Sequence, residues 1–390
     1  MTDEQHHPEE PQEEQEKRVG WPELFFDLVF VFAVTGVSGL LEVDHSWGGV
    51  LRAAIVFVPF YWLWVGTAIQ TNLQDVDRAP TRIAVFTIAL CAIFMAIALP
   101  EVYGGLSLLF AGAYWVGRLV LGRDVLRGVR HGRWPGLTPV TVSMVLTGPL
   151  LVVGALTDDV VREVIWAAAA VIDLSTPTVL RSRLRRLHVN AAHLSERFGL
   201  FVLIALGESV VAIGASTRGD HGLTVWVGVA VAAAFLLVCG LWWVYFQFAA
   251  QAVRYAMGSA SVQLDITRLV LSYGHFLFIF AIILLAVGLH GTVAEPTHHL
   301  EIAVAAMLLG GTALYLATFG FTRWAMFHLV SVTRLTTAGV MVVLIPLALV
   351  VPGLVVLALA AVAVTGLNVV EWRMNSRIGW RAKTTDVDHT

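Results

Sequence analysis

The chain has 390 residues, of which 57% are hydrophobic and only 14% are charged, and its formal net charge is −3. Apolar runs of about 17–25 residues, long enough to span a bilayer, recur along the sequence. Together with the low share of charged residues, these runs exclude an ordinary soluble domain. Two cysteines without metal-ligand spacing give no support to a metal centre. No motif for a nucleotide, cofactor or catalytic triad is found either. The sequence therefore predicts an all-α polytopic membrane protein without a cofactor, and not an enzyme.

The chain begins with a tail, residues 1–20, that is rich in Glu, Gln, His and Pro and is expected to be disordered. The tail lacks the features of a cleaved signal peptide, so the first apolar helix should itself direct insertion. Only Pro352-Gly353 separates the last two apolar runs, which a hairpin or a single broken segment would explain equally well. Counted as a hairpin, they bring the predicted spans to twelve, at residues 24–41, 48–69, 82–100, 105–122, 139–157, 162–180, 198–216, 223–246, 269–290, 301–320, 335–351 and 353–371.

Basic residues fall on one side of the predicted membrane. If the amino terminus is cytoplasmic, 22 of the 25 Lys and Arg residues lie in inside segments, and the outside segments hold Arg52, Arg162 and Arg218. Cytoplasmic loops carry such an excess of positive charge. We therefore expect a plasma-membrane protein with both termini in the cytoplasm, a basic linker at 181–197 and a second cytoplasmic tail at 376–390. The linker arginines serve as a topology signal or bind anionic lipid headgroups.

The two halves of the chain resemble each other. Glu23-Leu-Phe opens the first span and Glu196-Arg-Phe opens the seventh, while Tyr61-Trp-Leu-Trp-Val matches Leu241-Trp-Trp-Val one span later. The fifth and eleventh spans keep a proline at a comparable place. These matches predict two six-helix repeats, at 21–180 and 198–375, which are parallel because six is an even number.

Two acids open the first span. The helical period places Glu23, Asp27 and Ser38 on one face. An ionised Asp a full turn inside an apolar span costs roughly 2.5–3.5 kcal/mol, so Asp27 should face protein or water. Glu23 is more simply a helix-start acid stabilised by the helix dipole, and Glu196, with Arg197 as a local counter-charge, is predicted to open the seventh span in the same way.

Two further acids, Asp173 and Glu208, lie near the middle of predicted spans. Gly207 and Ser209 flank Glu208, so another helix can come close and the carboxylate should face the bundle. Pro177 frees the backbone carbonyl of Asp173, which predicts a local opening of that helix. Each acid either takes part in an ion-coupled step or ties helices together by hydrogen bonds.

Histidines give a weaker signal. His275 lies within the ninth span, where it is either a satisfied core residue or part of an ion path. His290, His298 and His299 lie near two glutamates in a predicted outside loop, which we interpret as solvated and not as a metal site.

Two longer stretches resemble a known family. Glu23-Leu-Phe-Phe-Asp-Leu-Val-Phe-Val-Phe-Ala and His193-Leu-Ser-Glu-Arg-Phe-Gly-Leu-Phe-Val-Leu-Ile-Ala-Leu-Gly-Glu-Ser-Val are similar to segments of the bacterial low temperature requirement protein A family. The resemblance covers about residues 19–375 and implies a multi-pass membrane protein with a link to growth in the cold. The first stretch is also similar to the Phe-Ser-Asp signature of an endolysosomal and bacterial potassium channel family with six-helix repeats. Here Phe26-Asp27 lacks the serine, and Phe198-Gly199 lacks the aspartate.

From these residues we expect a secondary transporter of a small solute or ion. Its protonatable or cation-binding groups would be Asp27, Asp173 and Glu208, and hydroxyls would line the path at Thr35, Ser38 and Ser209. The alternatives are a cation channel, a cold-stress sensor and an embedded lipid-modifying enzyme. The expected partners are the lipid bilayer and the solute, a homo-oligomer is compatible with the sequence, and nucleic acid is not expected.

Overall fold

A computed structural model describes residues 19–131, 136–184, 189–217, 224–249, 256 and 263–387. The predicted amino-terminal tail up to residue 18, residues 185–188 of the basic linker and the last three residues of the carboxy-terminal tail lie outside these ranges. Within them the chain is helical, and its one β-bridge, His299 to Pro352, is isolated. The prediction of an all-α protein is confirmed.

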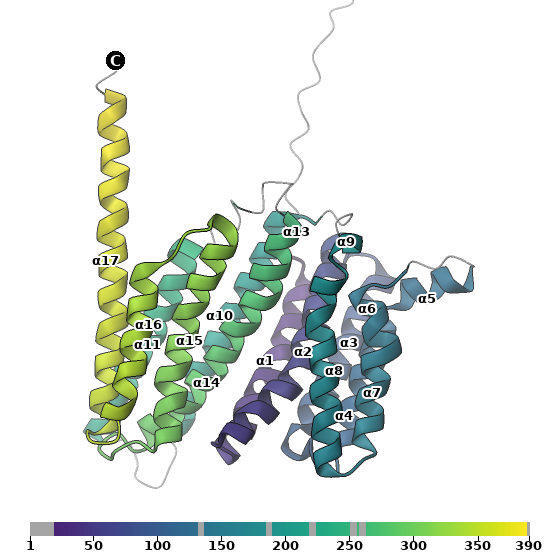
Figure 1. The fold of residues 1–390 in the computed structure, drawn as a ribbon, viewed down its shortest axis with the longest axis horizontal. Coiled ribbons are helices and arrows are strands. Elements are labelled where there is room, and N and C mark those ends of the chain that lie inside the picture. Colours follow the sequence, from purple (N-terminus) through teal and green to yellow (C-terminus); the bar gives the residue numbers. More distant parts are fainter. Residues whose placement is uncertain are drawn as a thin grey trace, which may run out of the picture.

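The first half of the chain forms a group of helices at one side of the molecule (Figure 1). Prolines at the first or second position help to start α1, α3 and α6, where a missing N–H costs nothing. The elements are α1 (Trp21–Val43), α2 (Trp47–Leu73), α3 (Ala79–Ala98), η1 (Leu99–Glu101), α4 (Ser107–Leu121), α5 (Arg123–Arg130), α6 (Pro139–Val142), the π-helical η2 (Ser143–Thr147), α7 (Gly148–Ala155), α8 (Asp159–Val179) and α9 (Arg181–Leu184).

The second half forms the other side. The last two apolar runs are separate helices, α16 and α17, which pack against each other. Helix α17 continues without a break through the predicted boundary at residue 376 and projects beyond the other helices (Figure 1). The elements are α10 (Ala191–Ser216), α11 (Val225–Val244), η3 (Tyr245–Ala249), α13 (Gln263–Ile266), η4 (Thr267–Gly274), α14 (His275–Ala294), α15 (Ile302–Phe327), α16 (Val332–Leu347) and α17 (Gly353–Val387).

Eight helices of the described chain are long and apolar enough to cross a membrane. Helical segments also occupy the other four predicted spans, but α4, α16 and the combined α6, η2 and α7 are shorter, and α8 begins with the charged residues Asp159, Arg162 and Glu163. Twelve crossings therefore stay a prediction. The eight are Trp21–Val43, Trp47–Leu73, Ala79–Glu101, Ala191–Ser216, Val225–Gln247, Thr267–Ala294, Ile302–Phe327 and Gly353–Met374.

Helices of the two halves have corresponding neighbours. In the first half α1 packs on α2 and α3, α3 packs on α4, α4 packs on α7, and α8 packs on α2 and α7. In the second half α10 packs on α11 and α14, α14 packs on α15, α15 packs on α16, and α17 packs on α11 and α16. Between the halves, α1 contacts both α10 and α14.

Aromatic side chains fill the boundary between the halves. Trp64 of α2 stacks on Phe201 of α10 with ring centroids 4.2 Å apart, and it meets Phe198 edge-on at 4.8 Å. Tyr61, one turn earlier, donates a hydrogen bond of 3.0 Å to the carbonyl of Leu271 in η4. Helix α2 thus packs on helices of the first half and also presents one face to the second half.

Glycines allow α14 and α15 to approach closely. A Cβ atom on Gly288 would lie 2.3 Å from the backbone nitrogen of Leu308, and one on Gly311 would lie 2.7 Å from that of Leu285. No larger residue fits at either position without moving a helix backbone.

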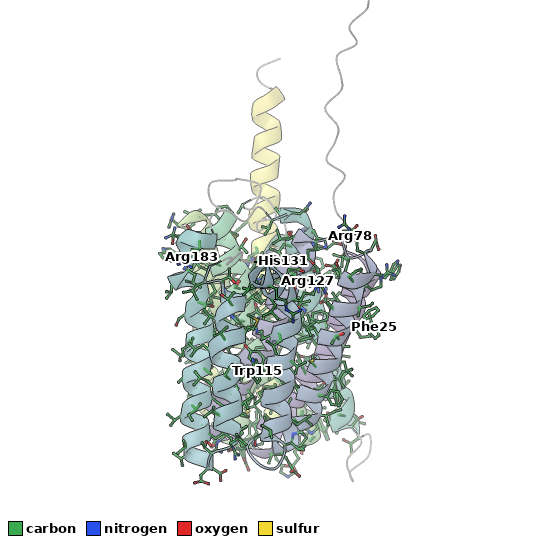
Figure 2. The ribbon with its side chains drawn as sticks, turned by 90° about the vertical axis from the view of Figure 1, so that its right-hand side faces the viewer. Phe25, Arg78, Trp115, Arg127, His131 and Arg183 are labelled. Atoms are coloured by element: carbon green, nitrogen blue, oxygen red, sulfur yellow. The ribbon has the colours of Figure 1, made fainter. Side chains whose placement is uncertain are left out.

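Basic side chains gather at one end of the bundle. Figure 2 shows Arg78, Arg127, His131 and Arg183 at the end from which α17 projects, whereas Trp115 lies near mid-height. The arginines predicted to be cytoplasmic in these loops therefore share one end.

Candidate functional site

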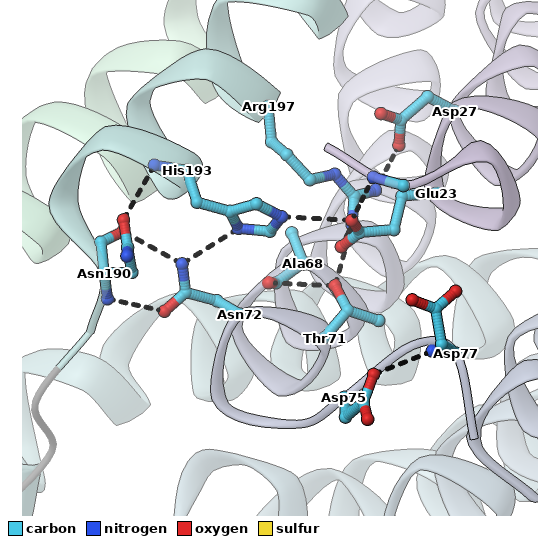
Figure 3. A network of polar contacts seen from close by, with 11 residues as sticks. Glu23, Asp27, Ala68, Thr71, Asn72, Asp75, Asp77, Asn190, His193 and Arg197 are labelled. Atoms are coloured by element: carbon cyan, nitrogen blue, oxygen red, sulfur yellow. Dashed lines mark hydrogen bonds and ion pairs between the residues drawn. The ribbon is translucent and has the colours of Figure 1, made fainter. Parts of the chain in front are cut away.

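A buried polar group joins α1, α2 and α10, and we call it the α1–α10 cluster (Figure 3). At its centre is Arg197 of α10, a fully buried guanidinium. Its Nη1 donates to Oε1 of Glu23 at 2.9 Å, and its Nη2 donates to Oδ1 of Asp27. The two acids lie one helical turn apart on α1, so a single arginine reaches both. An ion pair therefore links the two halves of the chain inside the bundle.

Histidine His193 extends the cluster. The Oδ1 atom of Asn72 accepts from the backbone nitrogen of Asn190 at 2.9 Å, which fixes the orientation of the Asn72 amide. Its Nδ2 therefore donates to Nδ1 of His193 at 3.0 Å, and Nε2 of His193 donates to Oε2 of Glu23 at 3.0 Å. The imidazole in this arrangement is neutral, because one ring nitrogen accepts a hydrogen bond and the other donates.

The cluster holds two carboxyl groups and one permanent cation. Nε1 of Trp64 donates to Oδ1 of Asp27 at 2.8 Å, and the Arg197 guanidinium lies 5.7 Å from the Trp64 ring centroid. Oδ2 of Asp27 has no hydrogen-bond partner among the described residues. Glu23 is thus fully engaged, whereas Asp27 keeps one buried oxygen atom for a further proton or cation.

The start of α10 explains why Arg197 is in the site. The side chain of Asn190 caps the helix by accepting from the backbone nitrogen of His193 at 3.0 Å, so α10 begins at Ala191, seven residues before the predicted span at 198. His193 and Arg197 consequently lie on one helix face instead of in a linker. Glu196 lies in the second helical turn, exposed, and its neighbour Arg197 pairs with α1.

A second polar contact lies farther along the same two helices. The hydroxyl of Thr35 donates to Oε2 of the buried Glu208 at 2.5 Å. Since Asp27 faces Arg197 and Thr35 faces Glu208, α1 and α10 run in parallel. The hydroxyls of Ser38 and Ser209 are also buried, and each lacks a hydrogen-bond partner in the part of the chain that the structure describes.

The remaining predicted acid, Asp173, lies in a separate group within the first half, which we call the Asp173 cluster. Its Oδ1 accepts from the hydroxyls of Ser143 at 2.8 Å and Thr147 at 2.9 Å, and its Oδ2 accepts from Tyr114 at 2.5 Å. Arg118 donates from Nε to the Tyr114 hydroxyl at 3.0 Å. The structure therefore does not bring Asp173 together with Asp27 and Glu208.

Helix α8 is not broken where the sequence predicts a local opening. It continues through Pro177 to Val179, and the carbonyl that the proline frees, on Asp173, accepts a hydrogen bond of 2.8 Å from the hydroxyl of Thr176. A side chain thus replaces the missing backbone donor.

Residues 18–369 match the family model of the bacterial low temperature requirement A protein (LtrA). The chain belongs to this family. It is also 32% identical, over 312 residues, to an uncharacterized protein of Rhizobium meliloti (strain 1021), an alignment that covers 77% of this chain and 76% of the relative. No solved structure matches the chain. Family membership and the eight apolar helices together indicate a multi-pass membrane protein.

In this LtrA-family chain, His275 has both ring nitrogens engaged. Nδ1 lies 2.9 Å from the carbonyl of Val270 and therefore donates, and Nε2 lies 2.7 Å from the hydroxyl of Tyr245, which donates to it. This geometry favours the core histidine over a member of an ion path. The described residues contain no group of three His, Cys, Asp or Glu side chains that could hold a metal ion.

Sequence reasoning missed Arg197 and His193 as site residues. The signal for them is the helix-capping asparagine at 190, followed by two basic side chains spaced four residues apart, as the acids of α1 are. Arg118 was counted as an inside basic residue, although an arginine within the apolar run Ala113-Tyr-Trp-Val-Gly-Arg-Leu-Val-Leu indicates a buried partner.

Proposed function

We propose that this LtrA-family protein is a secondary transporter of a small solute or ion in the plasma membrane, and that the α1–α10 interface is its coupling site. The observation that carries the proposal is the balance of charge. Three buried acids, Glu23, Asp27 and Glu208, lie along this interface, and one arginine, Arg197, pairs with two of them. Burying an uncompensated charge costs several kcal/mol, so a proton or a cation must balance the excess.

Glu208 is the group proposed to exchange that ion. It has no basic partner among the described side chains, and it accepts a hydrogen bond from the hydroxyl of Thr35. The unpaired hydroxyls of Ser38 and Ser209 lie on the same two helices and could supply oxygen ligands to a bound cation. Intramembrane acids in such positions mark ion pathways and proton relays.

The arrangement of the helices supports the proposed architecture of two six-helix repeats. The corresponding neighbours of α1 to α8 and of α10 to α17 are those expected of a repeated unit, and α1 and α10 are parallel. Twelve crossings place both termini on the same side. The basic residues at one end of the bundle support a cytoplasmic location for that end (Figure 2).

The test is ion flux into proteoliposomes that contain the purified protein, under proton, potassium and sodium gradients in turn. Glu208→Gln should abolish a protein-dependent flux. Glu196→Gln is the matched control, because it removes an exposed acid from the same helix and should leave the flux unchanged.

Absence of flux under every gradient would contradict the proposal and favour a sensor or an embedded enzyme. A flux that persists in Glu208→Gln and follows the membrane potential without saturating would favour a cation channel.

A further inference from the structure

A cavity of about 300 Å³ opens at the end of the bundle where α5 lies. It is bounded by α2, α4, α6 and α8 of the first half and by η4 of the second. Its walls are largely apolar, and they include the side chains of Trp62, Val65, Ile69, Leu121, Val140 and Pro177. Cavities that bind small molecules have this size and this character, with a few polar groups that orient the ligand.

Among the charged side chains in the wall of this cavity, Arg118 is almost completely buried. Arg118 is 1% exposed to solvent, and its Nε is bound to Tyr114. Its Nη2 has no hydrogen-bond partner among the residues that the structure describes. Gly66 leaves space for the guanidinium, because a Cβ atom there would lie 2.9 Å from Nη1 of Arg118.

The other charges around the cavity already have partners. Arg268 donates to Asp265 at 3.0 Å and to Thr178 at 3.1 Å, and Asp124 accepts from Gln74 at 2.9 Å. The nearest balancing acid for Arg118, Asp173, is reached only through the hydroxyl of Tyr114. Arg118 thus differs from Arg268, because its hydrogen bond goes to a neutral hydroxyl and not to a carboxylate, and we take its guanidinium as the group that orients a ligand in this cavity.

We infer that the cavity binds a small amphipathic carboxylate, with its head group on Arg118 and its apolar body against the walls. A guanidinium binds a carboxylate through two parallel hydrogen bonds, which suits an arginine whose Nη2 is unpaired. A volume of about 300 Å³ accommodates a short chain or a single ring. This inference concerns binding and does not require transport.

Binding of radiolabelled hexanoate to the protein in phosphatidylcholine nanodiscs tests the inference, with hexanol and hexylammonium as competitors. Hexanoate should bind saturably and at least about tenfold more tightly than either competitor, because both lack the anionic head group. Arg118→Gln should remove the preference for hexanoate over hexanol.

A second variant covers the case in which Arg118→Gln does not fold. Ile69→Trp fills the cavity without replacing a charged residue and should abolish hexanoate binding, whereas Ile83→Trp, on the exposed face of α3, should leave it unchanged. Equal binding of hexanoate and hexanol by the unmodified protein, or full binding by a folded Ile69→Trp protein, would overturn the inference.

Discussion

Two buried arginines of this protein are held in different ways. Arg197 donates directly to two carboxylates and to the hydroxyl of Thr71, and it joins the two halves of the bundle. Arg118 lies within the first half, donates to a tyrosine hydroxyl, and has Asp173 as an indirect counter-charge. Both side chains are almost completely buried.

The difference shows that the surroundings of a buried arginine decide whether it stabilises the fold or is available to bind a ligand. A guanidinium that is paired with two acids has little capacity for a ligand, and removing it leaves charges buried without compensation. A guanidinium that reaches its acid through a neutral hydroxyl keeps donors for another anion. We therefore assign Arg197 to the stability of the helix interface and Arg118 to the cavity.

The largest effect is expected from Arg197→Leu, which leaves Glu23 and Asp27 buried without their cation. The free energy of unfolding should fall by about 3–5 kcal/mol, as measured by denaturation in mixed micelles. Adding Glu23→Gln and Asp27→Asn to the same protein should restore most of the loss. If Arg197→Leu alone were as stable as the unmodified protein, Arg197 could not be assigned to the stability of the helix interface.

Asp173→Leu should have a smaller effect, because it removes a hydrogen-bond acceptor but breaks no direct ion pair. The hydroxyls of Ser143, Thr147 and Tyr114 would lose their acceptor, and the unfolding free energy should fall by roughly 2–4 kcal/mol. Asp173→Asn, which keeps one carbonyl oxygen, is the control and should cost less than half as much. An equal loss in both variants would show that the charge, not the hydrogen bonding, matters in this cluster.

Tyr114→Phe tests the link between Arg118 and Asp173. It removes a single buried hydroxyl and should lower the unfolding free energy by about 1–2 kcal/mol. Tyr103→Phe provides a matched control, since that hydroxyl donates to the carbonyl of Arg52 at an exposed site. Equal losses of unfolding free energy in Tyr114→Phe and Tyr103→Phe would contradict the role of the Tyr114 hydroxyl as the link between Arg118 and Asp173.

The smallest effect is expected at an exposed acid. Hydrogen bonds from Ser46, and to a lesser extent the charge of Arg52, lower the pKa of Asp44 below its ordinary value of 3.8. The folded state is therefore favoured by ionised Asp44 at neutral pH, and this contribution is lost as the pH falls through the lowered pKa. Asp44→Asn should cost only a few tenths of a kcal/mol at pH 7. The difference in melting temperature from the unmodified protein should shrink as the pH falls below the ordinary pKa of an aspartate, and a difference that grows with acidity would contradict this assignment.

Helices were easier to predict from the sequence than their ends. Long apolar runs locate α1, α2, α3 and α14 because only a helix satisfies its backbone in such a segment. The start of α10 was placed seven residues late, since an N-cap such as Asn190 is a local hydrogen bond that hydropathy does not register. This error concealed Arg197 within a predicted linker.

The candidate site was predicted in part. Asp27 and Glu208 were found because ionisable residues within apolar runs are few, and the structure places both on the interface of α1 and α10. Asp173 was found by the same rule but lies in another cluster. The pairing of Glu23 with Arg197 joins residues 174 positions apart, and no local pattern carries that information. The roles of all three acids in transport stay predictions.

The glycine contacts between α14 and α15 have a consequence for measuring motion. Because Gly288 and Gly311 let the two backbones come into direct contact, separating the two helices would break this close packing. We expect α14 and α15 to move together as one rigid body during any conformational cycle. The distance between spectroscopic labels on α14 and α15 should therefore stay constant. Displacements of α1 and α10 could be measured relative to this pair.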